Sequence, residues 1–271
     1  MTLAEATRQL LTAYQGGAAV ALLFDYDGTL TPIVPHPWLA EISAETRELL
    51  QQLIQQPRLH LGILSGRSLE ELIQMVGLAN LYYCGTSGLE LDLRGKRLLP
   101  PHAEEATHLI DGLARSLQSL AAGASGAWVE KKPLGLTVHY RAVAAALIPA
   151  FRERVNHVLN GYDGQVEVVP GPAAIEVTAN LGWNKGTAVY MIVNDVGPNA
   201  IPFYAGDFAN DAVAMEAVRN LGGFAVGIGG QAPPANCCLS DASALMAFLR
   251  SFLEKIEQLA SSDSNPLVPH A

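Results

Sequence analysis

Cysteine is scarce in this sequence, and the few cysteines present exclude several classes of protein. Among 271 residues there are three, Cys84, Cys237 and Cys238, and they form no CxxC motif of the kind that binds zinc. An odd number with two adjacent members gives no disulfide framework, so we expect three reduced thiols in a cytoplasmic protein.

Long apolar runs and basic clusters are also missing. No run reaches the roughly 18 apolar residues of a membrane-spanning helix, and residues 1–15 have the pattern of an amphipathic helix rather than of a signal peptide. The 17 basic and 26 acidic residues give a formal net charge of −9, without the concentrated basic patch that binds nucleic acid. We therefore expect no membrane or nucleic-acid partner. A small anionic substrate would be held by a few local cations and a metal.

Hydrophobic residues make up 49% of the chain, which is enough for a large core with or without a smaller appended domain. The range 18–24 is a continuous apolar run that stops at Asp25, as a strand buried on both faces of a parallel sheet does. Two more strands and two helices are expected at 59–64, 81–84, 44–56 and 68–76. This alternation predicts an α/β fold with a doubly wound (Rossmann-like), mostly parallel sheet.

The pattern changes near residue 104. Helices are expected there at 104–121 and 143–159, and strands at 127–132, 134–141, 165–169 and 173–178. The α/β alternation then resumes at 184–193, 201–205, 212–219, 224–227 and 240–259. We therefore predict a Rossmann-like core (1–103 and 180–260), an inserted αββαββ cap domain (104–179) and a disordered tail (261–271).

Polar residues directly follow three of the predicted strands. They are Asp25 and Asp27, Ser65 and Arg67, and Asp207 and Asp211, with Lys185 at the start of an intervening helix. Ligands of open α/β sheets bind at the carboxyl ends of the strands, so these groups are predicted to converge on one crevice. Taken singly, each has a simpler explanation as a turn, a helix cap or a surface charge. Together and in this order they favour a functional site.

These residue types suit phosphoryl transfer. One carboxylate can attack phosphorus to give an aspartyl-phosphate, and a second, two positions later, can protonate the leaving alcohol and then activate water. Carboxylates from two strand ends supply the hard oxygen ligands that Mg²⁺ prefers. The hydroxyls of Thr29 and Ser65, amides of a tight glycine turn and the Lys185 ammonium would bind the phosphate oxygens.

The order DxDGT, SGR, K and GDxxxD resembles the haloacid dehalogenase-like superfamily of aspartate-nucleophile phosphatases, and more narrowly the trehalose-6-phosphate phosphatases. The segments that carry the resemblance are 24–33 (FDYDGTLTPI), 64–67 (LSGR), 85–90 (GTSGLE), 138–141 (VHYR) and 183–186 (WNKG). The resemblance extends over about 18–229, nearly the whole of the chain expected to fold.

The resemblance implies a role for each matching residue. Asp25 would be the nucleophile and Asp27 the acid/base. Mg²⁺ would be held by Asp25, the main-chain carbonyl of Asp27, Asp207 and, in support, Asp211, and the phosphate by Thr29, Ser65, Gly66 and Lys185. Substrate contacts would come from Arg67, Glu130, Lys132, His139, Arg141, Glu176 and Asn184. For the cap residues, a solvated hairpin end or an outward strand position is an equally natural explanation.

Two departures from the family pattern bear on the substrate. The last motif usually reads GDDxTDED, whereas residues 206–211 read GDFAND, closer to relatives that act on sucrose phosphate or hexose phosphates. Ser87 stands where the family often has histidine. The leading hypothesis is Mg²⁺-dependent hydrolysis of a sugar phosphate, with trehalose 6-phosphate as the first candidate and functional pairing with a glycosyl-phosphate synthase. The alternatives are phosphates of sucrose, glucosylglycerol, glucosylglycerate or mannosylglycerate, a phosphomutase, or a non-catalytic sugar-phosphate-binding module.

Overall fold

The computed structural model describes residues 2–34, 36–171, 173–207, 209–230 and 235–263. Within these residues, eight strands form one sheet in the order β12-β11-β10-β1-β2-β3-β4-β5. The strands are β1 (Val20–Phe24), β2 (Leu59–Leu64), β3 (Tyr82–Gly85), β4 (Glu90–Leu93), β5 (Lys96–Leu98), β10 (Ile201–Gly206), β11 (Phe224–Ile228) and β12 (Cys237–Leu239). Neighbours run parallel from β12 to β3, and the last two pairs, β3 with β4 and β4 with β5, are antiparallel. The expected mostly parallel α/β sheet is confirmed.

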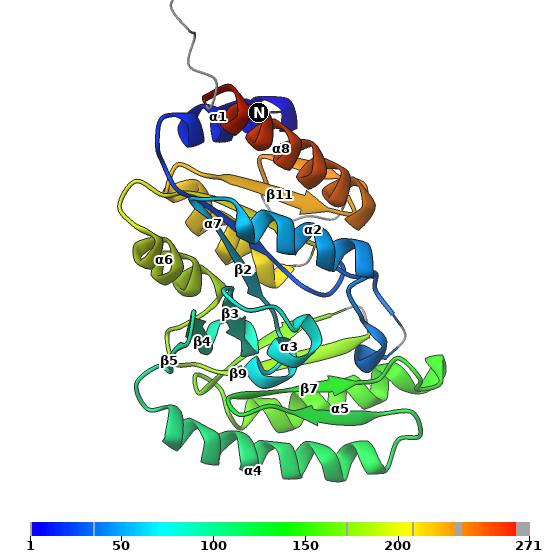
Figure 1. The fold of residues 1–271 in the computed structure, drawn as a ribbon. Coiled ribbons are helices and arrows are strands. Elements are labelled where there is room, and N and C mark those ends of the chain that lie inside the picture. Colours follow the sequence, from blue (N-terminus) through cyan, green and yellow to red (C-terminus); the bar gives the residue numbers. More distant parts are fainter. Residues whose placement is uncertain (1, 35, 172, 208, 231–234, 264–271) are drawn as a thin grey trace, which may run out of the picture.

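Helices cover both faces of this sheet (Figure 1). They are α1 (Leu3–Gln15), α2 (Ala44–Gln55), α3 (Leu69–Val76) and α8 (Ala242–Asp263) on one face, and α6 (Lys185–Val196) and α7 (Ala212–Asn220) on the other. The central strand β1 shows why: Leu22 and Phe24 belong to the first hydrophobic layer, whereas Ala21 and Leu23 belong to the second. Burying a side chain of the size of Leu or Phe contributes roughly 1.5–3 kcal/mol, so a strand buried on both faces anchors the core.

A second sheet contains the strands β6 (Trp128–Lys131), β7 (Gly135–His139), β9 (Ala174–Ala179) and β8 (Val166–Pro170), all antiparallel and in that order. One face of it packs on α4 (Ala103–Ala122) and α5 (Ile148–Asn160) through Leu136, Val138, Ile175 and Val177. Because side chains alternate along a strand, the residues between these point to the opposite face. That face looks toward the large sheet, and the two helices lie on the far side (Figure 1).

Several element predictions need correction. The helix expected from 143 begins only at Ile148, after a short 3₁₀ turn, because Pro149 has no amide proton and fits the first helical turn rather than the interior of a helix. The β4–β5 hairpin was not predicted. Its two-residue turn has Arg94 and Gly95 at φ 55° and 102°, and arginine is an unusual residue for a turn of this type. The three-residue strand β12 was not predicted either, because so short a segment shows no clear pattern of apolar residues.

The predicted disordered tail (261–271) stays a prediction. Residues 261–263 are helical and end α8. Residues 264–271 lie outside the described residues. None of the described helices is both long and apolar enough to cross a bilayer. The segment from α4 to β9 lies in the chain between β5 and α6, and the division into a core (1–103, 180–260) and a cap (104–179) stays a prediction.

Candidate active site

Three adjacent parallel strands bring the predicted site residues to one edge of the sheet. β1 lies between β10 and β2, and its last residue, Phe24, is in register with Ala205 and Ile63. Asp25 follows Phe24 directly, and Asp207 and Ser65 come two positions after Ala205 and Ile63. All three therefore approach the same edge, where they line a common cavity. The predicted convergence at the carboxyl ends of the strands is confirmed as geometry.

Lys185 is a fully buried cation at this edge. Its Nζ lies 2.7 Å from Asp25 Oδ1 and 2.7 Å from Asp211 Oδ1, and its side chain is fully buried. Burial by itself lowers a lysine pKa, but the charges of Asp211 and Asp25 outweigh that effect, so the Lys185 pKa is raised and the ammonium stays charged. The simpler explanation of Lys185 as a surface charge is therefore wrong.

Three carboxylates share a small volume beside this lysine. Asp25, Asp207 and Asp211 each offer an oxygen, and these atoms lie within 4.8 Å of one another. Burial raises the pKa of Asp25 well above its usual range, with Lys185 opposing, and burial together with Asp211 raises the pKa of Asp207 to about 7. A divalent cation with a preference for oxygen ligands would remove this cost of crowded, desolvated charge, so the residues present fit such an ion.

Asp211 has a supporting position within this group. Its Oδ1 accepts hydrogen bonds from Lys185 and from the Tyr204 hydroxyl, at 2.7 and 2.5 Å, and its Oδ2 accepts one from the Asp207 amide at 3.1 Å. Both oxygens are therefore occupied by protein donors. This carboxylate orients Lys185 and the main chain at Asp207, and Asp25 and Asp207 are the more available ligands.

Arg67 holds the other carboxylate of the DxD motif. Its Nε and NH2 donate to Asp27 Oδ2 and Oδ1 at 2.8 and 2.7 Å, which is a two-pronged ion pair. The same guanidinium donates to Glu71 Oε1 and to the Pro37 carbonyl, both at 2.6 Å. Although burial alone would lower it, the pKa of Arg67 is raised by its bonds and charge contacts to Asp27. Arg67 thus ties the ends of β1 and β2 together.

The turn after Asp25 depends on a glycine. Gly28 has φ 86°, and a Cβ at this position would overlap the Asp207 carboxylate. The main chain of the DxDGT loop can approach Asp207 only because no side chain stands there.

The neighbouring Thr29 is fully buried, and among the buried side-chain atoms described its Oγ1 is the one without a hydrogen-bond partner. It does not line the cavity.

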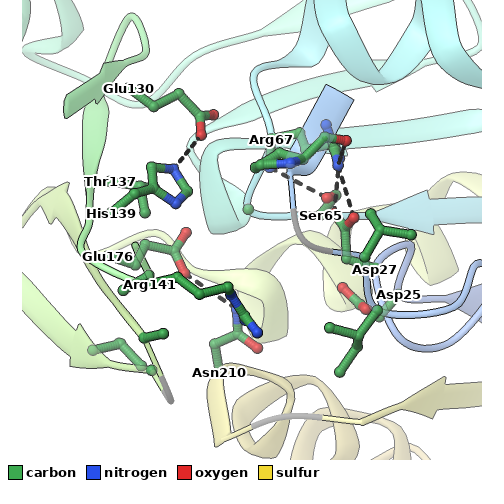
Figure 2. A pocket seen from close by; sticks show the side chains of 18 of the residues that line it. Asp25, Asp27, Ser65, Arg67, Glu130, Thr137, His139, Arg141, Glu176 and Asn210 are labelled. Atoms are coloured by element: carbon green, nitrogen blue, oxygen red, sulfur yellow. Dashed lines mark hydrogen bonds and ion pairs between the residues drawn. The ribbon is translucent and has the colours of Figure 1, made fainter. Parts of the chain in front are cut away.

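A cavity of about 280 Å³ lies between the two sheets, with carboxylates on both sides of it. The side formed by the second sheet, called the cap side below, is built by strand register: Glu130 on β6 is opposite Thr137 on β7, which is opposite Glu176 on β9. Figure 2 shows these side chains pointing toward the same space as Asp25 and Asp27. The lining residues predicted from sequence are Asp25, Asp27, Ser65, Gly66, Arg67, Asp207, Glu130, Lys132, His139, Arg141 and Glu176.

The polar cap residues form a connected group. His139 Nε2 and Glu130 Oε2 lie 2.7 Å apart, and Lys132 Nζ donates to Thr137 Oγ1 at 2.8 Å. Burial would raise the pKa of Glu130, but the bond from His139 and the charge of Lys132 lower it to about 2. Arg141 also lines the cavity, and it is exposed, with no hydrogen bond or ion pair to the residues that the structure describes.

An aromatic contact joins the core and the cap beside the cavity. Trp38, in the 3₁₀ turn Pro37–Leu39, lies against Trp128 of β6 with ring centroids 5.7 Å apart. Trp128 in turn stacks on His139, with centroids 4.0 Å apart. The loop that follows the DxDGT motif is therefore in contact with the strand that carries Glu130.

One predicted substrate contact has another place in the structure. Asn184 does not line the cavity, and its Oδ1 caps α6 by accepting from the amides of Gly186 and Thr187 at 2.9 and 3.1 Å. Sequence reasoning missed several lining residues: Ile33, Val34, Pro37, Thr137, Val169, Gly171, Ala173, Ala174 and Asn210. Thr137 could have been found, because it is two positions before His139 and so faces the same way along the strand.

Comparisons with known proteins agree with this geometry. The sequence profile of the trehalose-phosphatase family matches residues 23–232 of this chain. The chain belongs to this family. Family members are phosphoric monoester hydrolases, and the haloacid dehalogenase-like resemblance is confirmed.

Individual relatives show how far the likeness extends. Trehalose 6-phosphate phosphatase RA3 of Zea mays is 29% identical over 265 residues, covering 90% of this chain and 73% of that protein. Trehalose-phosphate phosphatase B of Arabidopsis thaliana is 28% identical over 254 residues, covering 88% and 67%. The C-terminal domain of C. albicans trehalose-6-phosphate phosphatase has the same fold, with a TM-score of 0.75 at 24% identity over 94% of this chain and 96% of that chain.

Proposed function

We propose that this phosphatase hydrolyses trehalose 6-phosphate to trehalose and phosphate, with Mg²⁺ as cofactor. The observation that carries the proposal is the cluster in which Lys185 contacts both Asp25 and Asp211, beside a cavity that is also lined by Glu130 and Glu176. Acidic and basic groups on the core side suit a phosphate and a metal, and those on the cap side suit sugar hydroxyls. The curated relatives with trehalose-phosphatase names support the choice of sugar.

The nucleophile in this proposal is Asp25. One of its oxygens attacks phosphorus, and the bond from phosphorus to the sugar oxygen breaks, leaving an aspartyl-phosphate. Lys185, 2.7 Å from Asp25, keeps that carboxylate oriented and offers positive charge to the phosphate oxygens as negative charge develops. Ser65 and Gly66 line the cavity and are proposed as further phosphate contacts, whereas for Thr29, which does not line it, this role stays a prediction from sequence.

The proton is moved by Asp27 in this proposal. It gives a proton to the departing sugar oxygen, and it then takes one from a water that attacks phosphorus, which releases phosphate and restores Asp25. Asp27 must leave the Arg67 fork, in whole or in part, to reach the sugar oxygen, because both its oxygens are bound there.

Mg²⁺ would be held by Asp25, Asp207 and the main-chain carbonyl of Asp27, with Asp211 in support. When bound, it supplies positive charge that offsets the crowded carboxylates and the phosphate. The raised pKa values of Asp25 and Asp207 support this assignment, because burial disfavours their charged forms and Lys185 offsets that cost only in part.

The segment 104–179 is proposed to act as a cap over the sugar. It contributes Glu130, Lys132, His139, Arg141 and Glu176 to the cavity. Closing such a cap excludes water from the reaction and completes the set of sugar contacts. A cytoplasmic location and a pairing with a glycosyl-phosphate synthase stay predictions.

The test is a substrate profile of the purified protein, measured as free phosphate released with Mg²⁺ and with excess chelator. We expect kcat/KM for trehalose 6-phosphate to exceed that for glucose 6-phosphate by at least about tenfold. Activity should be lost with chelator and restored by Mg²⁺. Turnover of trehalose 6-phosphate no better than that of glucose 6-phosphate refutes the substrate, and metal-independent turnover refutes the mechanism. Phosphate kept on a sugar bisphosphate, instead of released, would identify a phosphomutase.

A further inference from the structure

Glu176 is a cap residue whose two carboxylate oxygens are bound by the core. The Ser87 hydroxyl donates to Oε1 at 2.6 Å, and the Asn210 side-chain amide donates to Oε2 at 3.3 Å. Ser87 is in the turn that follows β3, and Asn210 is in the turn that follows β10. Two core loops that are far apart in sequence therefore meet on one side chain of β9.

The carboxylate of Glu176 lies directly against the turn after β2. A Cβ placed on Gly66 would be 2.6 Å from Glu176 Oε1, so only glycine leaves room for this contact. Gly66, Glu176 and Asn210 all line the cavity, and Figure 2 shows Glu176 and Asn210 side by side. The cap carboxylate is thus held next to the turn proposed to bind phosphate.

The turn that carries Ser87 has an unusual main chain. Thr86 and Ser87 have φ values of 44° and 52°, in the left-handed region that residues other than glycine rarely adopt. The turn is fixed by hydrogen bonds from its amides to the carbonyls of Arg67 and Ser65, at 2.6 and 3.0 Å. The Thr86 hydroxyl also bonds to the buried Glu90 carboxylate. Main-chain strain of this kind persists where the surrounding structure enforces it, often at a functional position.

We infer that Ser87 and Asn210 are positioning residues for Glu176, holding its carboxylate where it meets the sugar of the substrate. A carboxylate has about four acceptor positions, so two donors from the core leave others that face the cavity and can accept sugar hydroxyls. This inference rests on the proposed function, in that the cavity holds the sugar of a phosphate ester. Both residues stand at positions where the sequence departs from the family pattern, and both departures act on the same cap side chain.

The test compares two variants of Ser87. Ser87→Gly removes the hydroxyl and suits the positive φ, so relief of the main-chain strain should offset the lost hydrogen bond and keep the thermal unfolding temperature close to that of the wild type. Ser87→Asn keeps a donor, and asparagine tolerates the left-handed region. Each is assayed with trehalose 6-phosphate and with p-nitrophenyl phosphate, whose leaving group has no sugar hydroxyls.

We expect Ser87→Gly to lower kcat/KM for trehalose 6-phosphate by about tenfold, the effect of losing one hydrogen bond to a charged group, mostly through a higher KM. Its activity on p-nitrophenyl phosphate should stay within about twofold, and Ser87→Asn should recover most of the lost kcat/KM. In a Glu176→Ala background, adding Ser87→Gly or Asn210→Ala should cause no further loss with the sugar ester.

An equal loss on both substrates, no loss on either, or an undiminished loss in the Glu176→Ala background would overturn the inference. Failure of the proposed function has a different signature, since it is seen in the wild type as the absence of a preference for trehalose 6-phosphate. The same cycle is then run with the sugar phosphate that the wild type hydrolyses fastest, and it tests the positioning of Glu176 in the same way.

Discussion

Lys185 Nζ lies 2.7 Å from Asp25 Oδ1, although 160 positions separate the two residues in the sequence. Lys185 begins α6, which comes after all four strands of the second sheet in the sequence, whereas Asp25 follows the first strand, β1. Both side chains are buried in the folded protein, although Asp25 also lines the cavity. The charged site therefore exists only when the two segments of the large sheet that flank the cap are folded together.

Replacing Asp25 by asparagine should abolish turnover, because an amide is a poor nucleophile toward phosphorus. We expect kcat to fall by at least about 100-fold in phosphate-release assays. The fold should be kept, and without metal the unfolding temperature should not fall, since burial raises the pKa of Asp25 and disfavours its charge. Asp111→Asn, in a surface ion pair with Lys131, is the matched control. Activity of Asp25→Asn above a few per cent of wild type removes Asp25 as the nucleophile.

Replacing Lys185 by methionine should destabilise the protein strongly. It leaves the buried Asp25 and Asp211 carboxylates without their counter-charge, which typically costs about 3–5 kcal/mol. The free energy of unfolding can be measured in urea with chelator present. Lys131→Met is the control, because its exposed pair with Asp111 contributes only about 0–1 kcal/mol. Equal losses in the two variants would show that Lys185 is not the electrostatic centre of the site.

Gly28→Ala should damage the site more than the same substitution at a glycine of positive φ elsewhere in the chain. A Cβ at Gly28 overlaps the Asp207 carboxylate, whereas one at Gly95, which also has positive φ, meets nothing within 4 Å. Both variants should lose about 1 kcal/mol or more of stability from the main-chain conformation. Only Gly28→Ala should lose Mg²⁺-dependent activity, measured as phosphate release across a Mg²⁺ titration. Normal activity in Gly28→Ala would contradict the close approach of this turn to Asp207.

The Glu130 carboxyl should make the free energy of unfolding depend on pH in the acidic range. Its pKa is lowered from 4.5 to about 2, so the folded protein holds fewer protons there than the unfolded chain. This contribution is complete above about pH 4.5 and is lost as the pH falls toward 2. Urea unfolding between these pH values should show a shallower pH dependence for Glu130→Gln than for the wild type. Parallel curves for the two proteins would mean that the contact with His139 does not stabilise the charged form.

The sequence predicted the site better than its surroundings, for physical reasons. Asp25, Ser65 and Asp207 each follow an apolar run. Parallel strands place the residues that follow them at one edge of the sheet, whatever the packing of the individual side chains. The partners of these residues depend on tertiary geometry. The Arg67 fork on Asp27 and the pairing of Glu130 with His139 arise from side-chain direction and hairpin register, which no local pattern specifies.

Two polar residues that stand directly before helices, Ser68 and Asn184, both act as helix N-caps in the structure. Serine before a helix is a common N-cap, and the Ser68 hydroxyl does accept from the Glu71 amide at 3.4 Å at the start of α3. Asn184, just before α6, has the same chemistry, yet it was predicted as a substrate contact from its place in a motif. The cap explanation was available from sequence, because asparagine before a helix is among the commonest N-caps.

The contact between Trp38 and Trp128 provides an intrinsic spectroscopic probe of the distance between the two sheets. These are two of the three tryptophans in the chain, one on the loop after the DxDGT motif and one on the cap, with rings 5.7 Å apart. Indole rings at this separation couple their electronic transitions in a distance-dependent way. Near-ultraviolet circular dichroism and intrinsic fluorescence should therefore report any change in the separation of the two sheets during turnover, in unlabelled protein and without any substitution.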